Sequence, residues 1–132
     1  MNTNEILDRL IAFPSVFTAS DYSAITDYAI SLLEPVGVTC HRLKAPGSGR
    51  AGLFASMGPA GPGGIMLSAH LDVVPVTGQD WRTDPFVATR RDDRIYGRGA
   101  SDMKGFAAAA IRVMAEAARV PLTQPLKLAL SY

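Results

Sequence analysis

The apolar run from Ile65 to Val74, IMLSAHLDVV, constrains the fold more than any other part of the sequence. It is rich in branched residues and bounded by glycine and proline, which is typical of a short strand buried on both faces. His70 and Asp72 interrupt this run with ionisable side chains. Because burying an ionisable group without a partner costs several kcal/mol, we expect both at the strand's end, facing a cleft, or paired with each other or with a metal.

The spacing of His70 and Asp72 favours a shared role for the two side chains. Alternation along an extended chain places both on the same side, about 6 to 7 Å apart at the backbone. An aspartate in this position can accept the proton of one imidazole nitrogen and leave the other nitrogen free to bind a cation. The alternative interpretation is a strand that leaves the core with one satisfied histidine, because His-x-Asp is common by chance.

Size and charge exclude several classes of protein. The length of 132 residues fits one domain, which would bury roughly two thirds of the surface of its unfolded chain. No apolar run approaches the roughly 18 to 20 residues that span a bilayer, and the N-terminus does not resemble a secretory signal, so we expect a cytoplasmic protein without membrane contact. Thirteen basic and 12 acidic residues without a basic block argue against nucleic acid as a partner. Cys40, the only cysteine, allows no intrachain disulfide and is expected to be a core thiol rather than a nucleophile.

Three segments have the spacing of apolar residues that is typical of helices. The first has Thr3 as its expected N-cap and is ended by Pro14. The second is expected to start at Ser20 or Asp21, and the third is rich in alanine, a strong helix former. The expected helices cover residues 3–13, 20–33 and 103–119.

Strand-like segments lie between and after these helices, separated by loops rich in glycine and proline. The turn Asp92-Asp93 predicts a short hairpin between Val87 and Tyr96. Strands that alternate with helices indicate an α/β fold, with a mixed, partly parallel sheet flanked by helices. The other expected strands cover residues 38–43, 51–57, 65–70 and 126–132.

The last predicted strand, LKLALSY, ends at Tyr132 without a polar tail, a turn or a cap. We therefore expect the sequence to be a portion of a longer chain. We also expect this strand to form an exposed apolar edge that is prone to pairing with other molecules.

Asp102 lies where the predicted hairpin gives way to the alanine-rich helix, in YGRGASDMKG. One interpretation is that Ser101 and Asp102 cap this helix. A second is nucleotide binding, since Gly97-x-Gly99 between a strand and a helix resembles a dinucleotide motif, but the charge of Asp102 would oppose a pyrophosphate. The third is a cation site: if the two loops meet at one edge of the sheet, His70 and Asp102 supply the ligand types that zinc accepts.

Three motifs carry a resemblance to a known family: SAHLDVVP at 68–75, DWRTDPF at 80–86 and IYGRGASDMKGF at 95–106. In this order and spacing they resemble the zinc-dependent amidohydrolases and peptidases. The resemblance implies that residues 1–132 are the N-terminal part of a di-zinc catalytic domain, with the lid and dimerisation domain and the rest of the catalytic domain absent. It is strongest to members that deacetylate N2-acetylornithine in arginine biosynthesis. The alternatives are desuccinylases, aminoacylases and carboxypeptidases, or a non-catalytic α/β binding module.

The resemblance also implies roles for individual residues. His70 matches the terminal ligand of one metal, Asp72 the catalytic aspartate that orients this histidine, and Asp102 the carboxylate that bridges two metals. It further implies a cis peptide bond between Asp102 and Met103.

The resemblance implies two Zn²⁺ ions, with Co²⁺ or Mn²⁺ as possible replacements, a small N-acyl amino acid as substrate, and a homodimer in the full-length form. The general base and the other metal ligands would follow Tyr132, so we expect this chain alone to bind metal weakly and to be inactive. A partner for a substrate carboxylate is one interpretation of the arginine-rich segment, and solvated surface charge is the other; the arginines concerned are Arg82, Arg90, Arg91, Arg94 and Arg98.

Overall fold

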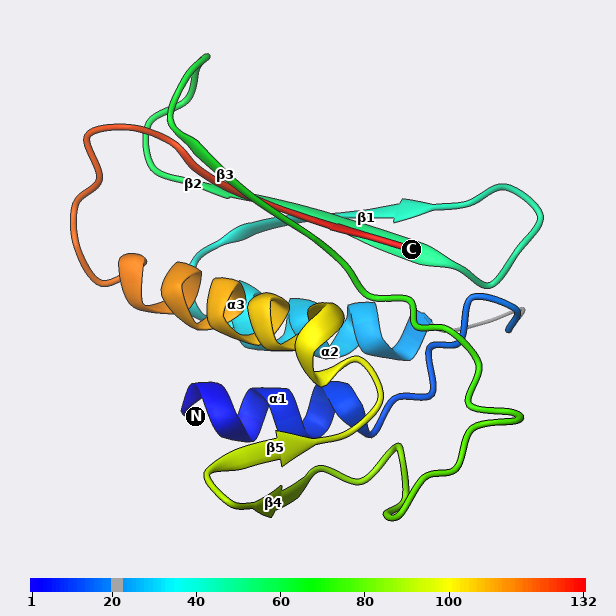
Figure 1. Ribbon diagram of the computed structural model, residues 1–132. Helices are drawn as coiled ribbons and strands as arrows, with labels where there is room; N and C mark the ends of the chain where they lie inside the picture. Colours follow the sequence, from blue (N-terminus) through cyan, green and yellow to red (C-terminus); the bar gives the residue numbers. More distant parts are fainter. Residues whose placement is uncertain (20–22) are drawn as a thin grey trace.

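The computed structural model describes residues 1–19 and 23–132. Within this part of the chain, a four-stranded sheet packs on two helices, a third helix lies below them, and a two-stranded hairpin stands apart from the sheet (Figure 1). The predicted α/β fold with a mixed, partly parallel sheet is thereby confirmed. The elements are α1 (Thr3–Ile11), α2 (Ser23–Leu33), η1 (Glu34–Val36), β1 (Thr39–Lys44), β2 (Ala51–Met57), β3 (Ile65–His70), β4 (Thr89–Arg91), β5 (Arg94–Tyr96), η2 (Ala100–Lys104), α3 (Gly105–Ala117) and β6 (Leu126–Ser131).

The main sheet has the strand order β1-β2-β6-β3. β6 pairs antiparallel with β2 and parallel with β3, so that His70 at the end of β3 lies opposite Ser131. The prediction that the last strand forms an exposed edge is therefore wrong. β6 is an interior strand of this sheet, and Leu128 and Leu130 are buried in the core.

β3 is an edge strand of the described sheet, and this corrects the expectation that it is buried on both faces. Ile65 and Met66 are 64% and 55% exposed, while Ala69 near the end of the strand is buried. β3 has a neighbouring strand on one side only, so its burial depends on the helices that pack on it. The buried end is the one that leads into the candidate site. Burial continues past the strand at Leu71 and Val73.

The start of α1 also differs from the expectation. Asn2, not Thr3, is the N-cap: its side chain accepts a hydrogen bond from the Glu5 amide at 3.0 Å, and the Glu5 carboxylate accepts one from the Asn2 amide at 2.7 Å. This reciprocal capping box satisfies two amides that the first turn would otherwise leave unpaired. The expected start of the second helix at Ser20 or Asp21 lies outside the described residues, and its end before η1 and Gly37 agrees with the prediction.

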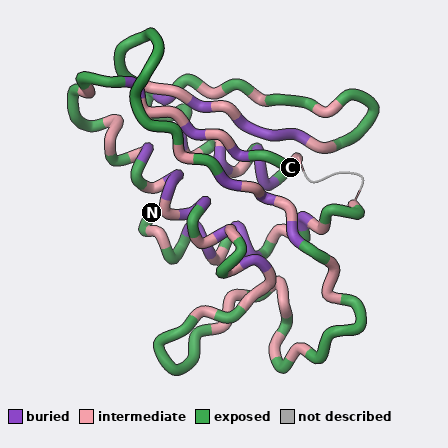
Figure 2. Tube along the Cα trace, turned by 45° about the horizontal axis from the view of Figure 1, so that its top comes forward, coloured by how far each residue is buried: buried purple, intermediate pink, exposed green. Residues whose placement is uncertain are grey.

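The core lies between the sheet and the helices, as the buried segments in Figure 2 show. The predicted hairpin is present, and Asp92 and Asp93 both have positive φ, at 53° and 56°, as a two-residue hairpin turn of type I′ requires. Among the described residues, no helix is long and apolar enough to cross a bilayer. The fully buried side chains that fill the core include Leu10, Ile11, Ile25, Leu33, Leu53, Ile111, Met114 and Leu128.

Candidate metal site

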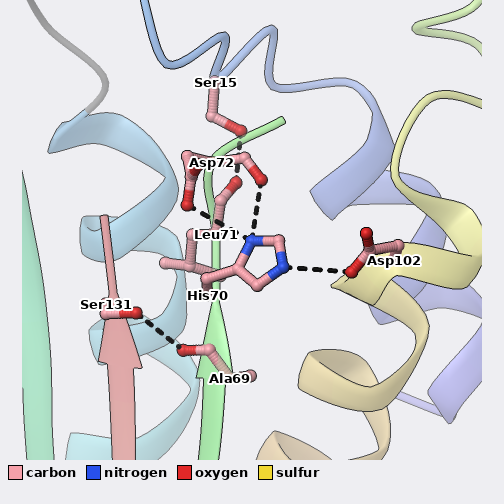
Figure 3. A network of polar contacts seen from close by, with 7 residues as sticks. All are labelled: Ser15, Ala69, His70, Leu71, Asp72, Asp102 and Ser131. Atoms are coloured by element: carbon pink, nitrogen blue, oxygen red, sulfur yellow. Dashed lines mark hydrogen bonds and ion pairs between the residues drawn. The ribbon is translucent and has the colours of Figure 1, made fainter. Parts of the chain in front are cut away.

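His70 is the last residue of β3, and Asp72 follows it after the strand has ended. Leu71 between them is fully buried, so the alternation of the chain turns His70 and Asp72 away from the core. The ring nitrogen Nδ1 of His70 lies 3.0 Å from the backbone oxygen of Asp72 and 3.2 Å from its carboxylate (Figure 3). Both of these oxygen atoms are hydrogen-bond acceptors, so Nδ1 carries a proton and donates it. This leaves Nε2 for another partner.

Asp102 is that partner. Its carboxylate oxygen Oδ1 lies 3.1 Å from Nε2 of His70, although the two residues are 32 positions apart in the chain (Figure 3). The structure thus brings together the two stretches that the sequence analysis expected to meet at one edge of the sheet. The side chain of His70 is 36% exposed and that of Asp102 is 88% exposed, so the contact faces solvent.

The backbone around Asp102 departs from a regular helix. The peptide bond between Asp102 and Met103 is cis, as the resemblance implied, and both residues have non-helical backbone angles within η2. The regular helix therefore begins at Gly105 and not at Met103 as predicted. Lys104 occupies the N-cap position and no side chain caps the helix, which leaves the interpretation of Ser101 and Asp102 as caps without support.

The electrostatics of His70 follow from its partners. Partial burial of the ring lowers the pKa of His70, but the hydrogen bond to Asp102 and the contacts with Asp72 outweigh this effect, and the net pKa is raised. Carboxylates on both sides of the ring therefore favour the protonated form. A proton on Nε2 and a cation would compete for the same position, so metal binding to the protonated ring would release a proton.

The donor atoms fit a metal ion in part. In a tetrahedral zinc site with bonds of about 2.1 Å, two ligand atoms lie about 3.4 Å apart. The observed 3.1 Å between Nε2 and Oδ1 is close to this spacing. Asp72 holds the opposite nitrogen, as carboxylates commonly do for metal-binding histidines. Within residues 1–19 and 23–132, however, no group of three or more His, Cys, Asp or Glu side chains is placed to hold an ion.

A hollow of about 240 Å³ opens beside these side chains, lined by His70, Asp72 and Asp102 together with residues of the 97–101 turn. Gly99 in this turn has a φ of +80°, and a Cβ there would lie 2.7 Å from Val73 Cγ1. A Cβ on Gly97 would similarly lie 2.8 Å from Ile11 Cγ2. Close packing therefore accounts for the glycine pair without a bound nucleotide.

Of the five arginines considered above, Arg98 lines this hollow. Its guanidinium group lies over the ring of Trp81, 5.1 Å from the ring centre, and donates a hydrogen bond to Gln79. Arg90 instead pairs with Asp8 at 2.8 Å on the surface.

The remaining candidates lie elsewhere. His41 is exposed on β1, where it stacks on Phe54 with the ring centres 6.4 Å apart. Cys40 is partly buried against the core, and burial raises the pKa of its thiol, in keeping with a core thiol.

Two buried polar residues beside the site, Ser15 and Lys104, were not predicted. The signal for Lys104 is a charge next to the apolar run GFAAAAI, but nothing local marks Ser15.

Residues 66–132 match the sequence profile described as peptidase family M20/M25/M40. The chain belongs to this family. A succinyl-diaminopimelate desuccinylase of Novosphingobium aromaticivorans is 42% identical over 115 residues, which cover 84% of this chain and 30% of that protein. An acetylornithine deacetylase of Photorhabdus laumondii is 36% identical over 129 residues, which cover 92% of this chain and 33% of that protein. The chain thus spans about a third of the length of these curated relatives.

Solved structures agree with this assignment. An M20 family metallo-carboxypeptidase from Sulfolobus solfataricus is 28% identical, with a TM-score of 0.75 over 99% of this chain and 30% of that one. Human carnosine dipeptidase 1, at 23% identity, has a TM-score of 0.78 over 98% of this chain and 31% of that one, a similarity of fold alone. The resemblance found in the sequence motifs is therefore confirmed at the level of the family and its hydrolase fold.

Proposed function

We propose that this chain is the N-terminal part of the catalytic domain of a metal-dependent hydrolase that cleaves the amide bond of small N-acyl amino acids. The observation that carries the proposal is the contact of 3.1 Å between Nε2 of His70 and Oδ1 of Asp102, with Asp72 on the opposite ring nitrogen. Family membership supports the same chemistry, because the matched relatives bear the names of a deacetylase and a desuccinylase.

In this proposal Nε2 of His70 and the carboxylate of Asp102 would hold a metal ion. Asp72 keeps the proton on Nδ1 and so fixes the orientation of the ring. The high exposure of Asp102 leaves its second carboxylate oxygen accessible to another cation, which supports a bridging role between two ions. A bound Zn²⁺, Co²⁺ or Mn²⁺ would lower the pKa of a coordinated water towards about 7 and polarise the acyl carbonyl.

N2-acetylornithine is the substrate we favour, and N-succinyl-diaminopimelate is the alternative. The acetylornithine deacetylase of Photorhabdus laumondii aligns with more of the chain, 92% against 84%, while the desuccinylase of Novosphingobium aromaticivorans is more similar in sequence, 42% against 36%. Arg98, held over Trp81 beside the hollow, is a candidate partner for a substrate carboxylate. A cytoplasmic location and a homodimer of the full-length form remain predictions.

The metal site is tested by titrating the purified chain with Zn²⁺ in a calorimeter. Binding is expected to be weak, because two protein ligands are fewer than the three usual at a catalytic zinc. His70→Ala and Asp102→Asn should each weaken binding at least tenfold. His41→Ala is the matched control, since His41 is the other histidine of the chain and lies on the surface of β1, and it should leave binding unchanged.

Two results would refute the proposal: no detectable binding by the unaltered chain, or equal binding by the chain with His70→Ala. The unaltered 132-residue chain should show no turnover of N2-acetylornithine or N-succinyl-diaminopimelate above a chelator-treated control. Robust deacylation by the 132-residue chain would show that it already carries a complete site.

A further inference from the structure

The segment that follows α1, Phe13–Phe17, lies against the stretch of chain that carries Asp72. Val16 and Val73 form a parallel bridge between the two. The Val73 amide donates to the Ser15 oxygen at 2.8 Å, and the Phe17 amide donates to the Val73 oxygen at 2.9 Å. Both main-chain polar groups of Val73 are therefore paired with this one segment.

The Ser15 side chain extends the same attachment to the other side of Asp72. Ser15 is fully buried, and its hydroxyl donates to the Leu71 oxygen at 2.6 Å (Figure 3). The Leu71 amide in turn donates to the Ser131 oxygen of β6 at 2.9 Å. The backbone is thus held both before and after Asp72, whose carboxylate contacts the ring of His70.

Lys104 ties the other loop of the site to the same segment. It is fully buried, and its Nζ donates to the Phe13 oxygen at 2.7 Å. Its own amide donates to the Gly99 oxygen at 2.8 Å, which closes the turn that contains Asp102. Lys104 is two residues from Asp102, so its anchored side chain restrains the backbone from which the Asp102 carboxylate projects.

From these contacts we infer that the segment Phe13–Phe17 is a clamp that sets the spacing of the candidate metal ligands. Its positioning residues are Ser15, which belongs to the segment, and Lys104, which is hydrogen-bonded to it. This inference rests on the proposed function for its consequence, metal affinity. Among the described residues the Asp102 carboxylate forms a hydrogen bond or ion pair with His70 and with no other side chain, so its position depends largely on its backbone. A metal site tolerates displacements of its ligands of only about 0.5 Å, so loosening either attachment should weaken binding.

Thr26 provides a matched control for Ser15. Like Ser15 it is fully buried, and its hydroxyl also donates to a backbone oxygen, that of Ala51 at 2.5 Å. It lies in α2 facing β2, and neither of these elements carries a candidate ligand. Ser15→Ala and Thr26→Val each remove one buried hydroxyl group, so both are expected to lower thermal stability to a similar extent.

The experiment measures Co²⁺ affinity and, in the metal-free chain, the amide chemical shifts of residues 70–73 and 101–104. Ser15→Ala should lower Co²⁺ affinity about tenfold and shift amides in both ranges, although Ser15 contacts only the first. Thr26→Val should change neither readout. Lys104→Met should resemble Ser15→Ala, and the double variant should lose less than the sum of the two single losses, because both residues act through one segment.

The possible outcomes distinguish a failure of the clamp from a failure of the proposed function. Equal losses of affinity in Ser15→Ala and Thr26→Val would reduce the effect to general destabilisation and overturn the clamp. If the unaltered chain does not bind Co²⁺, the proposed function fails and the metal-free shifts decide the inference. In that case, shifts that reach residues 101–104 in Ser15→Ala support the clamp, and their absence overturns it.

Discussion

Raising the pH from 7 to 10 is expected to stabilise the folded protein through Lys104. This side chain is fully buried, and burial lowers its pKa from 10.5 to about 8. Its positive charge is removed from water, and its Nζ is bonded to a neutral carbonyl oxygen, that of Phe13. Folding at neutral pH therefore carries the cost of a buried ammonium group, and this cost disappears when the group loses its proton.

The sign and size follow from proton linkage. Between pH 8 and 10.5 the unfolded chain holds a proton at Lys104 that the folded chain has lost, so the free energy of unfolding rises with pH. The difference of about 2.5 pKa units corresponds to about 3 kcal/mol in total. About 2.5 kcal/mol of this is gained between pH 7 and pH 10.

The assay compares urea unfolding of the unaltered chain and Lys104→Met at pH 7, 8, 9 and 10, with a chelator present. The difference in free energy of unfolding between the two proteins isolates Lys104, because the other titrating groups are common to both. This difference should move by about 2.5 kcal/mol in favour of the unaltered chain across the range. A difference that stays constant within about 0.5 kcal/mol would show that the ammonium group is not desolvated, and would refute the reasoning.

Three further predictions concern stability and are checked by urea unfolding at neutral pH. Asn2→Ala should lower the free energy of unfolding by about 1 kcal/mol, because it removes the side-chain half of the capping box of α1. Gly64→Ala should cost about 1 to 3 kcal/mol more than Gly47→Ala: both glycines have positive φ, but a Cβ at Gly64 would lie 1.9 Å from the Pro125 oxygen, whereas Gly47 has open space. Leu128→Ala in the interior strand β6 should cost about 2 to 5 kcal/mol, and a cost typical of an exposed edge, below about 1 kcal/mol, would contradict the strand order.

The strands and the hairpin turn could be predicted from the sequence because glycine, proline and Asp92-Asp93 mark their ends locally. The placement of His70 and Asp72 followed from alternation and from the cost of burying charge. The position of β6 could not be predicted in this way, since strand order depends on pairing between distant segments. Its apolar residues indicated burial but not which strands would cover them.

The candidate site likewise has a part that the sequence predicted and a part that it did not. That His70 and Asp102 come from separate loops was visible in the sequence, and their meeting was a hypothesis that the ordered motifs supported. Ser15 and Lys104 escaped prediction because their partners are backbone oxygens of Leu71 and Phe13, 56 and 91 positions away. A hydrogen bond to a distant carbonyl requires no particular residue at the accepting position, so it leaves no pattern there.

The asymmetry of the contacts at His70 supports the proposal that this residue binds a metal ion and is not part of a structural ion pair. On the Nδ1 side the ring is held by Asp72, and the backbone on either side of Asp72 is held by Ser15 and by Val16–Phe17. On the Nε2 side the only contact among the described residues is with Asp102, whose side chain is largely exposed. An exposed pair of this kind contributes only about 0 to 1 kcal/mol, so a cation that displaces the proton at Nε2 sacrifices little stability and keeps both donors. Because the side of the pair that faces the hollow is open to solvent, a cation could reach both donor atoms there.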